Sequence, residues 1–355
     1  MTSIAKPPVR HPGLPTNALG LTRRDYEGAM STLCAGCGHD SVTAALVQAF
    51  WELDLPPHRA AKLSGIGCSS KTTAYFLKQA HGFNSVHGRM PSIASGANAA
   101  NRTLTYVGVS GDGDSLSIGL GQLAHVIRRN VDMLYVLENN GVYGLTKGQF
   151  SASADVGSRS KRGEANASSP IDPVLLALTL GATFVARGFS GDKAQLVPLL
   201  KAGLVHRGFA LVDVISPCVT FNDHEGSTKS YRHTRQHAHA VAPVDFVPLR
   251  HAITAADGEP AAPGAALSVT MHDGSVVRFR STDERYDATD RDAAWAHVRR
   301  LQSQGEIATG LLHLDESGAD MHAVNRTVAT PLAELPYDRL CPGAAALDAL
   351  QAEYR

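Results

Sequence analysis

Apolar and polar positions form two alternating kinds of segment along the first two thirds of this chain. Short apolar runs, typical of buried strands, occur at 62–66, 104–110, 133–138, 182–186 and 209–215. In the segments between them, apolar residues recur every three or four positions, as on one face of a helix. We expect helices at about 40–53, 71–79, 91–101, 116–129, 172–180 and 192–206. This alternation predicts an α/β fold with a doubly wound parallel sheet.

These segments form a main domain at 25–245. The rest of the chain predicts an N-terminal arm at 1–24 and a small C-terminal extension at 246–355. Prolines and alanines from Val241 to Pro263 favour a linker into the extension. The extension should contain a hairpin at 268–279 that turns at Asp273-Gly274, and a helix at 290–304. Because it shows little chemistry, we expect it to pack on the surface or contact another subunit.

Composition narrows the class of protein. The chain has 355 residues, and its 33 Lys and Arg residues balance its 33 Asp and Glu residues. It therefore lacks the basic surface expected of a nucleic-acid-binding protein. We find neither a signal peptide nor an apolar run long enough to span a membrane. We expect a cytoplasmic protein.

Oxygen-bearing side chains follow two neighbouring predicted strands. Asp112, in Gly111-Asp112-Gly113-Asp114, follows the strand at 104–110, and Asn139-Asn140 follows the strand at 133–138. Because the carboxyl ends of parallel strands share one sheet edge, these residues should converge where α/β sheets bind ligands. An oxygen-only ligand set suits Mg²⁺, and glycine-tight turns let backbone amides approach a diphosphate.

Five cysteines raise a second kind of chemistry. Cys34 and Cys37 form a CxxC pair on a glycine-rich turn, while Cys68 and Cys218 follow apolar, strand-like segments. In a cytosolic chain of this size, such cysteines more often bind metal or do redox chemistry than form disulfides. The CxxC pair alone is equally compatible with an iron–sulfur cluster, half a zinc site or a thioredoxin-type pair. Cys341 fits none of these patterns and should be a free thiol.

The spacing of Gly111-Asp112-Gly113 from Asn139-Asn140 resembles the thiamine-diphosphate signature. The four cysteines, in the order CxxC, GCSS and SPC, resemble the cluster ligands in β subunits of 2-oxoacid:ferredoxin oxidoreductases. Segments 87–89, 143–149 and 220–224 resemble that family too, so the likeness covers roughly 25–245. One departure is Lys147, which stands where many relatives carry glycine.

The resemblance implies a thiamine-diphosphate-binding fold with a defined set of site residues. Mg²⁺ would be held by Asp112, Asn140 and the Val142 carbonyl, and a 4Fe–4S cluster by Cys34, Cys37, Cys68 and Cys218. Lys71, His87 and Leu145 would take part in catalysis, Lys71 by meeting the distal carboxylate of the substrate. The expected cofactor-binding residues are Ile66, Gly67, Cys68, Ser69, His87, Gly113, Asp114, Asn140, Gly144, Leu145 and Thr146.

The function implied is that of the β subunit of a 2-oxoglutarate:ferredoxin oxidoreductase. Such an enzyme of the TCA cycle converts 2-oxoglutarate and coenzyme A to succinyl-CoA and CO₂, and passes electrons to ferredoxin. The chain has no room for a second α/β domain, so an α subunit should supply the pyrimidine-binding half and the activating glutamate, within an (αβ)₂ assembly. Three alternatives stay open: a sibling acting on pyruvate or another 2-oxoacid, a non-oxidative thiamine-diphosphate lyase, and an electron-transfer subunit without thiamine.

A last candidate is the histidine-rich segment with His233, His237 and His239. Residues four apart share one side of a helix, which favours a metal-binding face. Arg232 and Arg235 would repel a cation, however, so a solvated helix face is the better interpretation.

Overall fold

A central sheet organises the computed structural model, which describes residues 13–160, 163–242, 244–247, 266–280 and 286–354. Its strand order is β2-β1-β3-β4-β8-β7-β13-β9, and all pairs are parallel except β13 with β7. The strands are β1 (Ala60–Ser64), β2 (His81–Asn84), β3 (Thr105–Gly111), β4 (Met133–Asn139), β7 (Phe184–Phe189), β8 (Phe209–Ile215), β9 (Ala238–Ala242) and β13 (Ile307–Leu314). The predicted parallel α/β sheet is confirmed.

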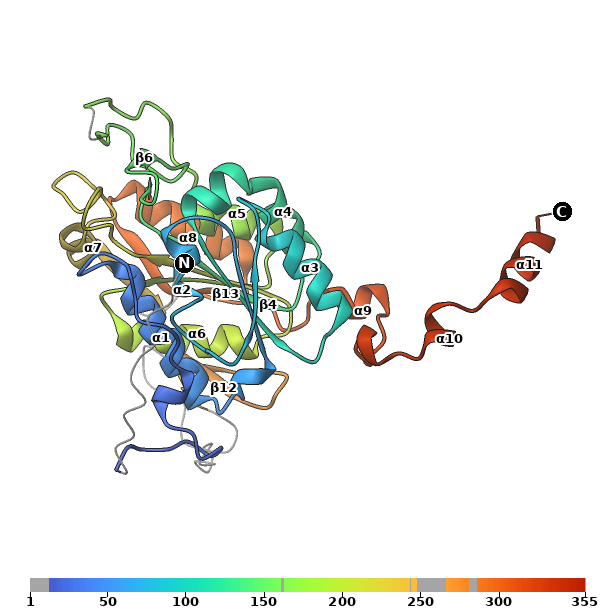
Figure 1. Cartoon of the computed structure of the whole chain (residues 1–355). Helices are drawn as coiled ribbons and strands as arrows, with labels where there is room; N and C mark the ends of the chain where they lie inside the picture. Colours follow the sequence, from blue (N-terminus) through green and yellow to red (C-terminus); the bar gives the residue numbers. More distant parts are fainter. Residues whose placement is uncertain (1–12, 161–162, 243, 248–265, 281–285, 355) are drawn as a thin grey trace.

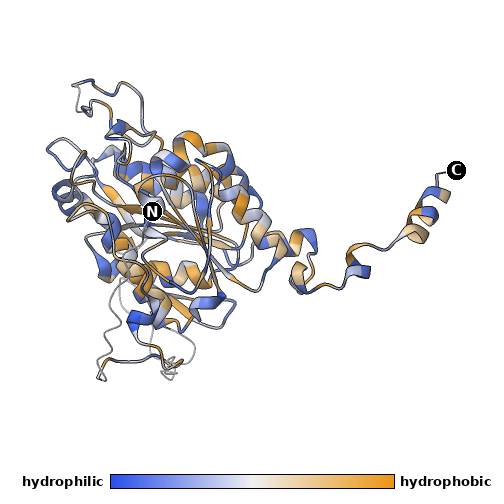
Figure 2. Cartoon of the chain, viewed as in Figure 1, coloured by the Kyte–Doolittle hydropathy of each residue, from blue (hydrophilic) through white to orange (hydrophobic). Residues whose placement is uncertain are grey.

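Helices cover both faces of this sheet (Figure 1). One face carries α1 (Gly38–Glu52) and α6 (Lys193–Val205); the other carries α3 (Met90–Ala100), α4 (Leu120–Arg128), α5 (Pro173–Leu180) and α8 (Arg291–Ser303). Successive strand residues alternate between the two cores: Val107 packs with the α1 and α6 side, and its neighbour Tyr106 with the other. Hydrophobic residues concentrate in these layers, as the orange colouring of Figure 2 shows.

The helix expected at 71–79 was wrong. Only the short α2 (Cys68–Thr72) forms, and the chain then turns, with Leu77 at φ +45°. The cause is a buried lysine on β1. Lys62 Nζ donates to the Thr73 and Phe76 carbonyls at 2.8 and 2.7 Å, which takes these acceptors away from a helical ladder. Burial also lowers the pKa of Lys62 to about 8.

The helix expected at 116–129 is interrupted. A π-helical turn, η3 (Gly113–Ile118), follows Asp112, and α4 begins only after Gly119. A β-carbon at Gly119 would lie 2.7 Å from the Asp114 carbonyl oxygen and 2.8 Å from that of Gly88. The backbone therefore packs closely at this point, directly beside the predicted phosphate loop. Irregular helical turns of this kind are frequent at functional sites.

The C-terminal third is built into the main fold. β11 (Ala266–Thr270) and β12 (Val276–Arg280) form the predicted hairpin, with Gly274 at φ +82°, and β10 (Val244–Val247) pairs with β12. The Asp290 side chain caps α8, as expected. β13 lies inside the main sheet, so the C-terminal segment is not separate from the main domain. Of the expected linker, 243 and 248–263 lie outside the described residues, as do 1–12 of the expected arm.

The last described residues leave the body of the molecule (Figure 1). After α9 (Met321–Asn325), the chain continues through η5 (Leu332–Glu334), α10 (Tyr337–Leu340) and α11 (Ala344–Ala352), none of which has a buried residue. Other short elements are η1 (Arg23–Tyr26), η2 (Pro57–Arg59), β5 (Val142–Tyr143), β6 (Gln149–Phe150) and α7 (Tyr231–His237). None of the described helices is long and apolar enough to cross a membrane.

Candidate functional site

A small cavity of about 70 Å³ opens at the carboxyl edge of the sheet, where the loops after β1, β3 and β4 meet. All eleven residues that we expected to bind the cofactor line this cavity, together with Asp112 and Val142. The sequence-predicted residues therefore converge, although they come from segments up to 80 positions apart. His39, Gly111 and Tyr143 also line the cavity.

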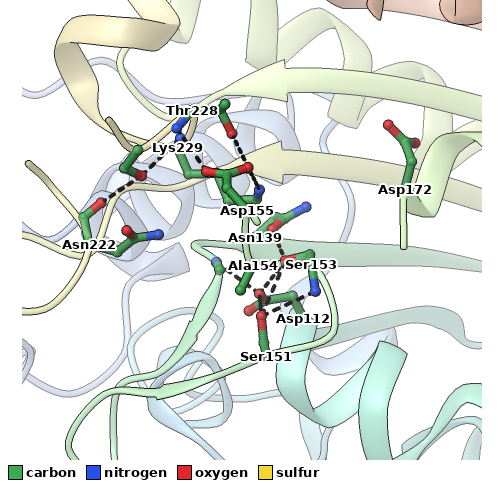
Figure 3. Close-up of polar contacts among 12 residues, drawn as sticks. Asp112, Asn139, Ser151, Ser153, Ala154, Asp155, Asp172, Asn222, Thr228 and Lys229 are labelled. Carbon is green, nitrogen blue, oxygen red and sulfur yellow. Dashed lines mark hydrogen bonds and ion pairs between the residues drawn. The ribbon is translucent and has the colours of Figure 1, made fainter. Parts of the chain in front are cut away.

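Among the described residues, all hydrogen-bond contacts to the Asp112 carboxylate are made through one of its two oxygens, Oδ2 (Figure 3). Its Oδ2 accepts a hydrogen bond from the Gly141 N–H at 2.9 Å and lies 2.5 Å from Ser151 Oγ and 2.6 Å from Ser153 Oγ. No described residue donates to Oδ1, and no described basic side chain pairs with this carboxylate, which is 1% exposed. A buried carboxylate without a cation is costly, so the site fits a bound metal ion.

Asn140 and Val142 supply the other oxygen atoms that could ligate a metal ion. Asn140 Oδ1 accepts from the Val142 N–H at 3.0 Å, and Asn222 Nδ2 donates to the Asn140 carbonyl at 2.8 Å. Gly141 between them has φ +78°, a left-handed conformation that favours glycine. This tight turn brings an amide oxygen and a backbone carbonyl to the cavity beside Asp112, the donor set that Mg²⁺ prefers.

Asp114 ties together the loops around the cavity. Its Oδ1 accepts from the backbone N–H groups of Ile66 and Gly88, at 3.2 and 2.7 Å, and lies 2.5 Å from His87 Nδ1. Ser110 Oγ donates to its other oxygen at 2.6 Å. Both oxygens of the Asp114 carboxylate therefore already have hydrogen-bond partners within the protein. His87 is placed by this contact at the cavity wall.

The four predicted cluster cysteines gather next to the cavity. Cys34 and Cys37 precede α1, Cys68 begins α2, and Cys218 follows β8. A β-carbon on Gly144, in the cavity wall, would lie 3.2 Å from Cys68 Sγ and 3.8 Å from Cys218 Sγ. Thr220 Oγ1 donates to Cys34 Sγ at 3.4 Å. All five cysteines are free thiols, and Cys341 lies in the projecting tail.

The thiols influence one another electrostatically. Burial first, and then nearby charges that include Cys218, raise the pKa of Cys37 to about 12. Burial and Cys218 raise the pKa of Cys68, which Lys71 opposes. Burial also raises the pKa of Cys218, while the backbone N–H groups of 220–222 act in the opposite direction. Backbone N–H groups that donate toward Cys218 would stabilise its thiolate form, the form in which cysteine binds a metal centre.

Two buried ionisable residues beneath the cavity were missed by the sequence analysis. His39 is 1% exposed, and burial lowers its pKa to about 4. Glu138 is fully buried, neither of its oxygens has a hydrogen-bond partner among the described residues, and burial raises its pKa well above the ordinary value. His39 Nδ1 lies 3.5 Å from Glu138 Oε2. A signal existed for both, since His39 follows CxxCG and Glu138 precedes Asn139-Asn140.

Comparison with known proteins agrees with this geometry. Residues 65–214 match a family model described as "Thiamine pyrophosphate enzyme, C-terminal TPP binding domain". The 2-oxoglutarate synthase subunit KorB of Methanocaldococcus jannaschii is 34% identical over 189 residues, which are 53% of this chain and 69% of that protein. The chain belongs to the family of 2-oxoacid:ferredoxin oxidoreductase β subunits.

Other relatives support this membership in the oxidoreductase β-subunit family. A 2-oxoacid:ferredoxin oxidoreductase β subunit of Saccharolobus solfataricus is 42% identical over 191 residues, which are 54% of this chain and 63% of that protein. This chain thus spans less than two thirds of that relative. A solved 2-oxoglutarate:ferredoxin oxidoreductase from Magnetococcus marinus, with 2-oxoglutarate, coenzyme A and succinyl-CoA bound, has a TM-score of 0.72 and 28% identity, covering 93% of this chain and 96% of that one.

Of the two residues that the family resemblance places beside the substrate, only one lines the cavity. Leu145 lines the cavity and is 51% exposed at its mouth. Lys71 does not line the cavity; its Nζ donates to the Thr32 carbonyl at 3.0 Å, just before the first cysteine. Lys147 has φ +79°, in the left-handed region that favours glycine. Glycine adopts this conformation more readily than lysine does.

The histidine-rich segment forms part of α7 and β9. His233 and His237 stack at 4.0 Å on α7, and His237 Nδ1 lies 2.9 Å from the His233 carbonyl, while His239 belongs to β9. Across the described ranges, no three His, Cys, Asp or Glu side chains are placed to share one metal ion. The cysteines therefore lack the tight arrangement of a single-ion zinc site.

A second, larger cavity of about 560 Å³ adjoins the first at the same sheet edge. It is joined to Asp112 by a buried polar chain, part of which Figure 3 shows. Ser153 Oγ lies 2.8 Å from Asn139 Oδ1, and Asn139 Nδ2 donates to Asp213 Oδ1 at 3.1 Å. Arg187 then links Asp213 to Asp172. Side chains that no sequence motif marks thus hold the Asp112 carboxylate in place.

Proposed function

We propose that this chain is the β subunit of a 2-oxoglutarate:ferredoxin oxidoreductase, which converts 2-oxoglutarate and coenzyme A to succinyl-CoA and CO₂ with electron transfer to ferredoxin. One observation carries the proposal: Gly144 lines the cavity that holds Asp112, and Cys68 Sγ and Cys218 Sγ lie beside Gly144. A 2-oxoacid site and a one-electron acceptor must be close for the oxidation, and this arrangement puts the two groups side by side.

Asp112, Asn140 and the Val142 carbonyl would hold Mg²⁺, which neutralises the diphosphate of the cofactor. When bound, thiamine diphosphate supplies an electron sink for the loss of CO₂ from a 2-oxoacid. The glycines at 67, 113 and 144 let the backbone approach the cofactor, and a β-carbon at Gly113 would collide with the Tyr143 ring at 2.5 Å. The chain's own residues would thus bind, orient and desolvate the cofactor's diphosphate end.

Cys34, Cys37, Cys68 and Cys218 would hold a 4Fe–4S cluster, which supplies one-electron transfer. The four cysteines come from three separate segments, and the backbone N–H groups of 220–222 donate toward Cys218. Such donors stabilise thiolate charge and tune the reduction potential of a cluster. From here electrons would leave to ferredoxin.

The choice of 2-oxoglutarate has two supports. Relatives from Mycobacterium tuberculosis and Methanocaldococcus jannaschii, at 39% and 34% identity, are named as 2-oxoglutarate enzymes, and the similar Magnetococcus marinus enzyme holds 2-oxoglutarate and succinyl-CoA. A distal carboxylate entering a closed site needs a cation, which Lys71 would provide by leaving the Thr32 carbonyl. Leu145 would then form an apolar wall beside the substrate chain, and His87 would contact the cofactor or the substrate carboxylate.

An α subunit would complete the active site. We propose that the glutamate that activates thiamine comes from this α subunit, since none of the described residues that line the cavity is a glutamate. Ile66, Leu145 and the nearby Val86 are 39%, 51% and 71% exposed around the mouth. Covering these apolar side chains would favour association with the α subunit, and we propose an (αβ)₂ assembly.

The experiment is an anaerobic co-purification with the α partner, followed by assays of 2-oxoglutarate, pyruvate and 2-oxobutyrate with coenzyme A and a one-electron dye. We expect iron in the protein, dye reduction that requires coenzyme A, and the highest kcat/KM for 2-oxoglutarate. Activity without iron would favour a non-oxidative thiamine enzyme. Iron without thiamine-diphosphate binding in calorimetry would instead leave an electron-transfer subunit.

A further inference from the structure

His39 lies beside the cavity, next to the loops that carry the cysteines. It lies in the first turn of α1, two residues after Cys37, and lines the cavity floor with a side chain that solvent does not reach. Its Nδ1 lies 2.6 Å from Ser216 Oγ. Its Nε2 lies 3.3 Å from Ser69 Oγ and 3.4 Å from Asn140 Nδ2. One ring therefore contacts three separate segments.

Each partner of the ring is next to a residue of the proposed chemistry. Ser69 follows Cys68, Ser216 stands two positions before Cys218, and Asn140 is itself a proposed Mg²⁺ ligand. The hydrogen bonds of His39 thus connect the loops that carry three of the four cysteines to the metal side of the cavity. Among the described contacts, no other single side chain makes this connection.

The hydrogen-bond pattern fixes both the ring and the amide. Asn140 Nδ2 can only donate, so Nε2 must accept, and the proton is on Nδ1 and is donated to Ser216 Oγ. With Nδ2 turned to His39, the amide oxygen Oδ1 lies on the other side, where it accepts from the Val142 N–H. An asparagine amide could otherwise rotate by half a turn and present nitrogen, which cannot ligate Mg²⁺.

We propose that His39 is a positioning residue, which presents Asn140 Oδ1 to the metal ion and holds the Cys68 and Cys218 loops in register with it. This inference rests on the proposed function, because it assigns His39 a task toward the Mg²⁺–diphosphate group and the cluster. Residues that orient metal ligands typically change metal affinity by about 10- to 100-fold when they are removed. A substitution of His39 should therefore change both the affinity for Mg²⁺ and the spectrum of the cluster.

Three substitutions separate positioning from simple packing. His39→Gln keeps an acceptor near the place of Nε2, whereas His39→Asn reaches only toward Ser216, and His39→Ala keeps neither contact. His206→Ala is the matched control, since His206 is also buried and also makes two side-chain contacts, to Thr183 and Glu316, away from the cavity. Each variant is purified anaerobically in complex with the α partner. Calorimetry measures the affinity for Mg²⁺ in the presence of thiamine diphosphate, and electron paramagnetic resonance records the reduced cluster.

We expect His39→Ala and His39→Asn to weaken Mg²⁺ binding by about 10-fold or more, and His39→Gln to recover most of it. His39→Ala should also shift the resonance of the cluster, and His206→Ala should change neither readout. Equal losses in the Gln and Asn variants, or Mg²⁺ affinity in His39→Ala within about twofold of the unmodified complex, would overturn the inference. If His39→Ala does not fold, the comparison of Gln with Asn decides.

The same measurements distinguish a failure of the proposed function from a failure of the role given to His39. An unmodified complex that binds neither thiamine diphosphate nor iron would refute that function, and the role of His39 with it. An unmodified complex that binds both, with His39 variants that behave as the His206 control does, would refute only the role of His39.

Discussion

Arg187 Nε donates to Asp213 Oδ2 at 2.6 Å, and the two side chains are 6% and 0% exposed in the middle of the sheet. The same guanidinium reaches Asp172 Oδ1 at 2.8 Å, and Asp213 Oδ1 accepts from Asn139. Asn139 in turn shares the Ser153 hydroxyl with Asp112. A charge on β7 is therefore connected through two strands to the proposed Mg²⁺ ligand.

Removing this cation should be strongly destabilising. Arg187→Met would leave the fully buried Asp213 and the partly exposed Asp172 without a cation, which costs about 3–5 kcal/mol when a buried ion pair is broken. Urea unfolding of the complex measures the change, and Lys201→Met, which removes a more exposed pair with Glu52, is the control with a smaller expected loss. Equal losses in both variants would show that the Arg187 network is no stronger than the Lys201–Glu52 pair.

Asp112→Ala should abolish tight binding of thiamine diphosphate with Mg²⁺. The substitution removes the charged ligand and leaves the diphosphate without neutralisation in a buried cavity. Calorimetry with and without Mg²⁺ measures it. Asp155→Ala is a suitable control, because Asp155 pairs with Lys229 in the adjoining cavity and not with the proposed metal. An unchanged affinity in Asp112→Ala would place the cofactor elsewhere.

Each of Cys34, Cys37, Cys68 and Cys218 should be required for the visible absorbance of a thiolate-bound cluster. Single serine variants of these four should lose iron, while Cys341→Ser should keep it, because Cys341 lies in the projecting tail. Iron analysis and the absorbance spectrum of the anaerobic complex are the measurements. Loss of the cluster in Cys341→Ser would show that the ligand assignment is incorrect.

The motif residues were predictable because they are local. Asp112, Asn140 and Val142 follow strands whose apolar runs are evident, and parallel strands deliver their carboxyl ends to one edge. Ser151 and Ser153 were not predicted, since their contacts with Asp112 join segments 39 and 41 residues apart and leave no spacing signal. His39 follows the CxxCG motif, but the sequence does not show its contact with Ser216, 177 residues away. The helix expected at 71–79 failed for the same reason, because a lysine on another element takes its carbonyls.

Stability should depend on pH through Glu316. Burial alone would raise its pKa, but hydrogen bonds from His206 and His272 lower the pKa of this carboxyl from 4.5 to about 2. A lowered folded-state pKa contributes stability that is complete above the ordinary value and is lost as the pH falls toward the folded value. Glu316→Gln should therefore be less stable than the unmodified chain at neutral pH, and the gap should close as the pH falls from about 4.5 to about 2. Urea midpoints across that range measure it; a gap that stays constant would assign the effect to packing.

Lys71→Met tests substrate choice. The Lys71 ammonium contacts the Thr32 carbonyl beside the cysteine loop, and its charge opposes the raised pKa of Cys68, so it lies near the cluster end of the cavity. A 2-oxoglutarate carboxylate that entered without this cation would be buried unpaired. The loss should appear mainly in KM for 2-oxoglutarate, and kcat/KM for pyruvate, which lacks the distal carboxylate, should change far less.

The size of this effect follows from the charge pair. A hydrogen bond to a charged group contributes about 1.5–3 kcal/mol, so kcat/KM for 2-oxoglutarate should fall by about 10- to 150-fold relative to pyruvate. Lys78→Met, at an exposed lysine on the same segment, should leave the ratio of the two substrates unchanged. Equal losses on both substrates in Lys71→Met would mean that Lys71 supports the cysteine loop through Thr32. We would then expect a cation of the α subunit to meet the distal carboxylate.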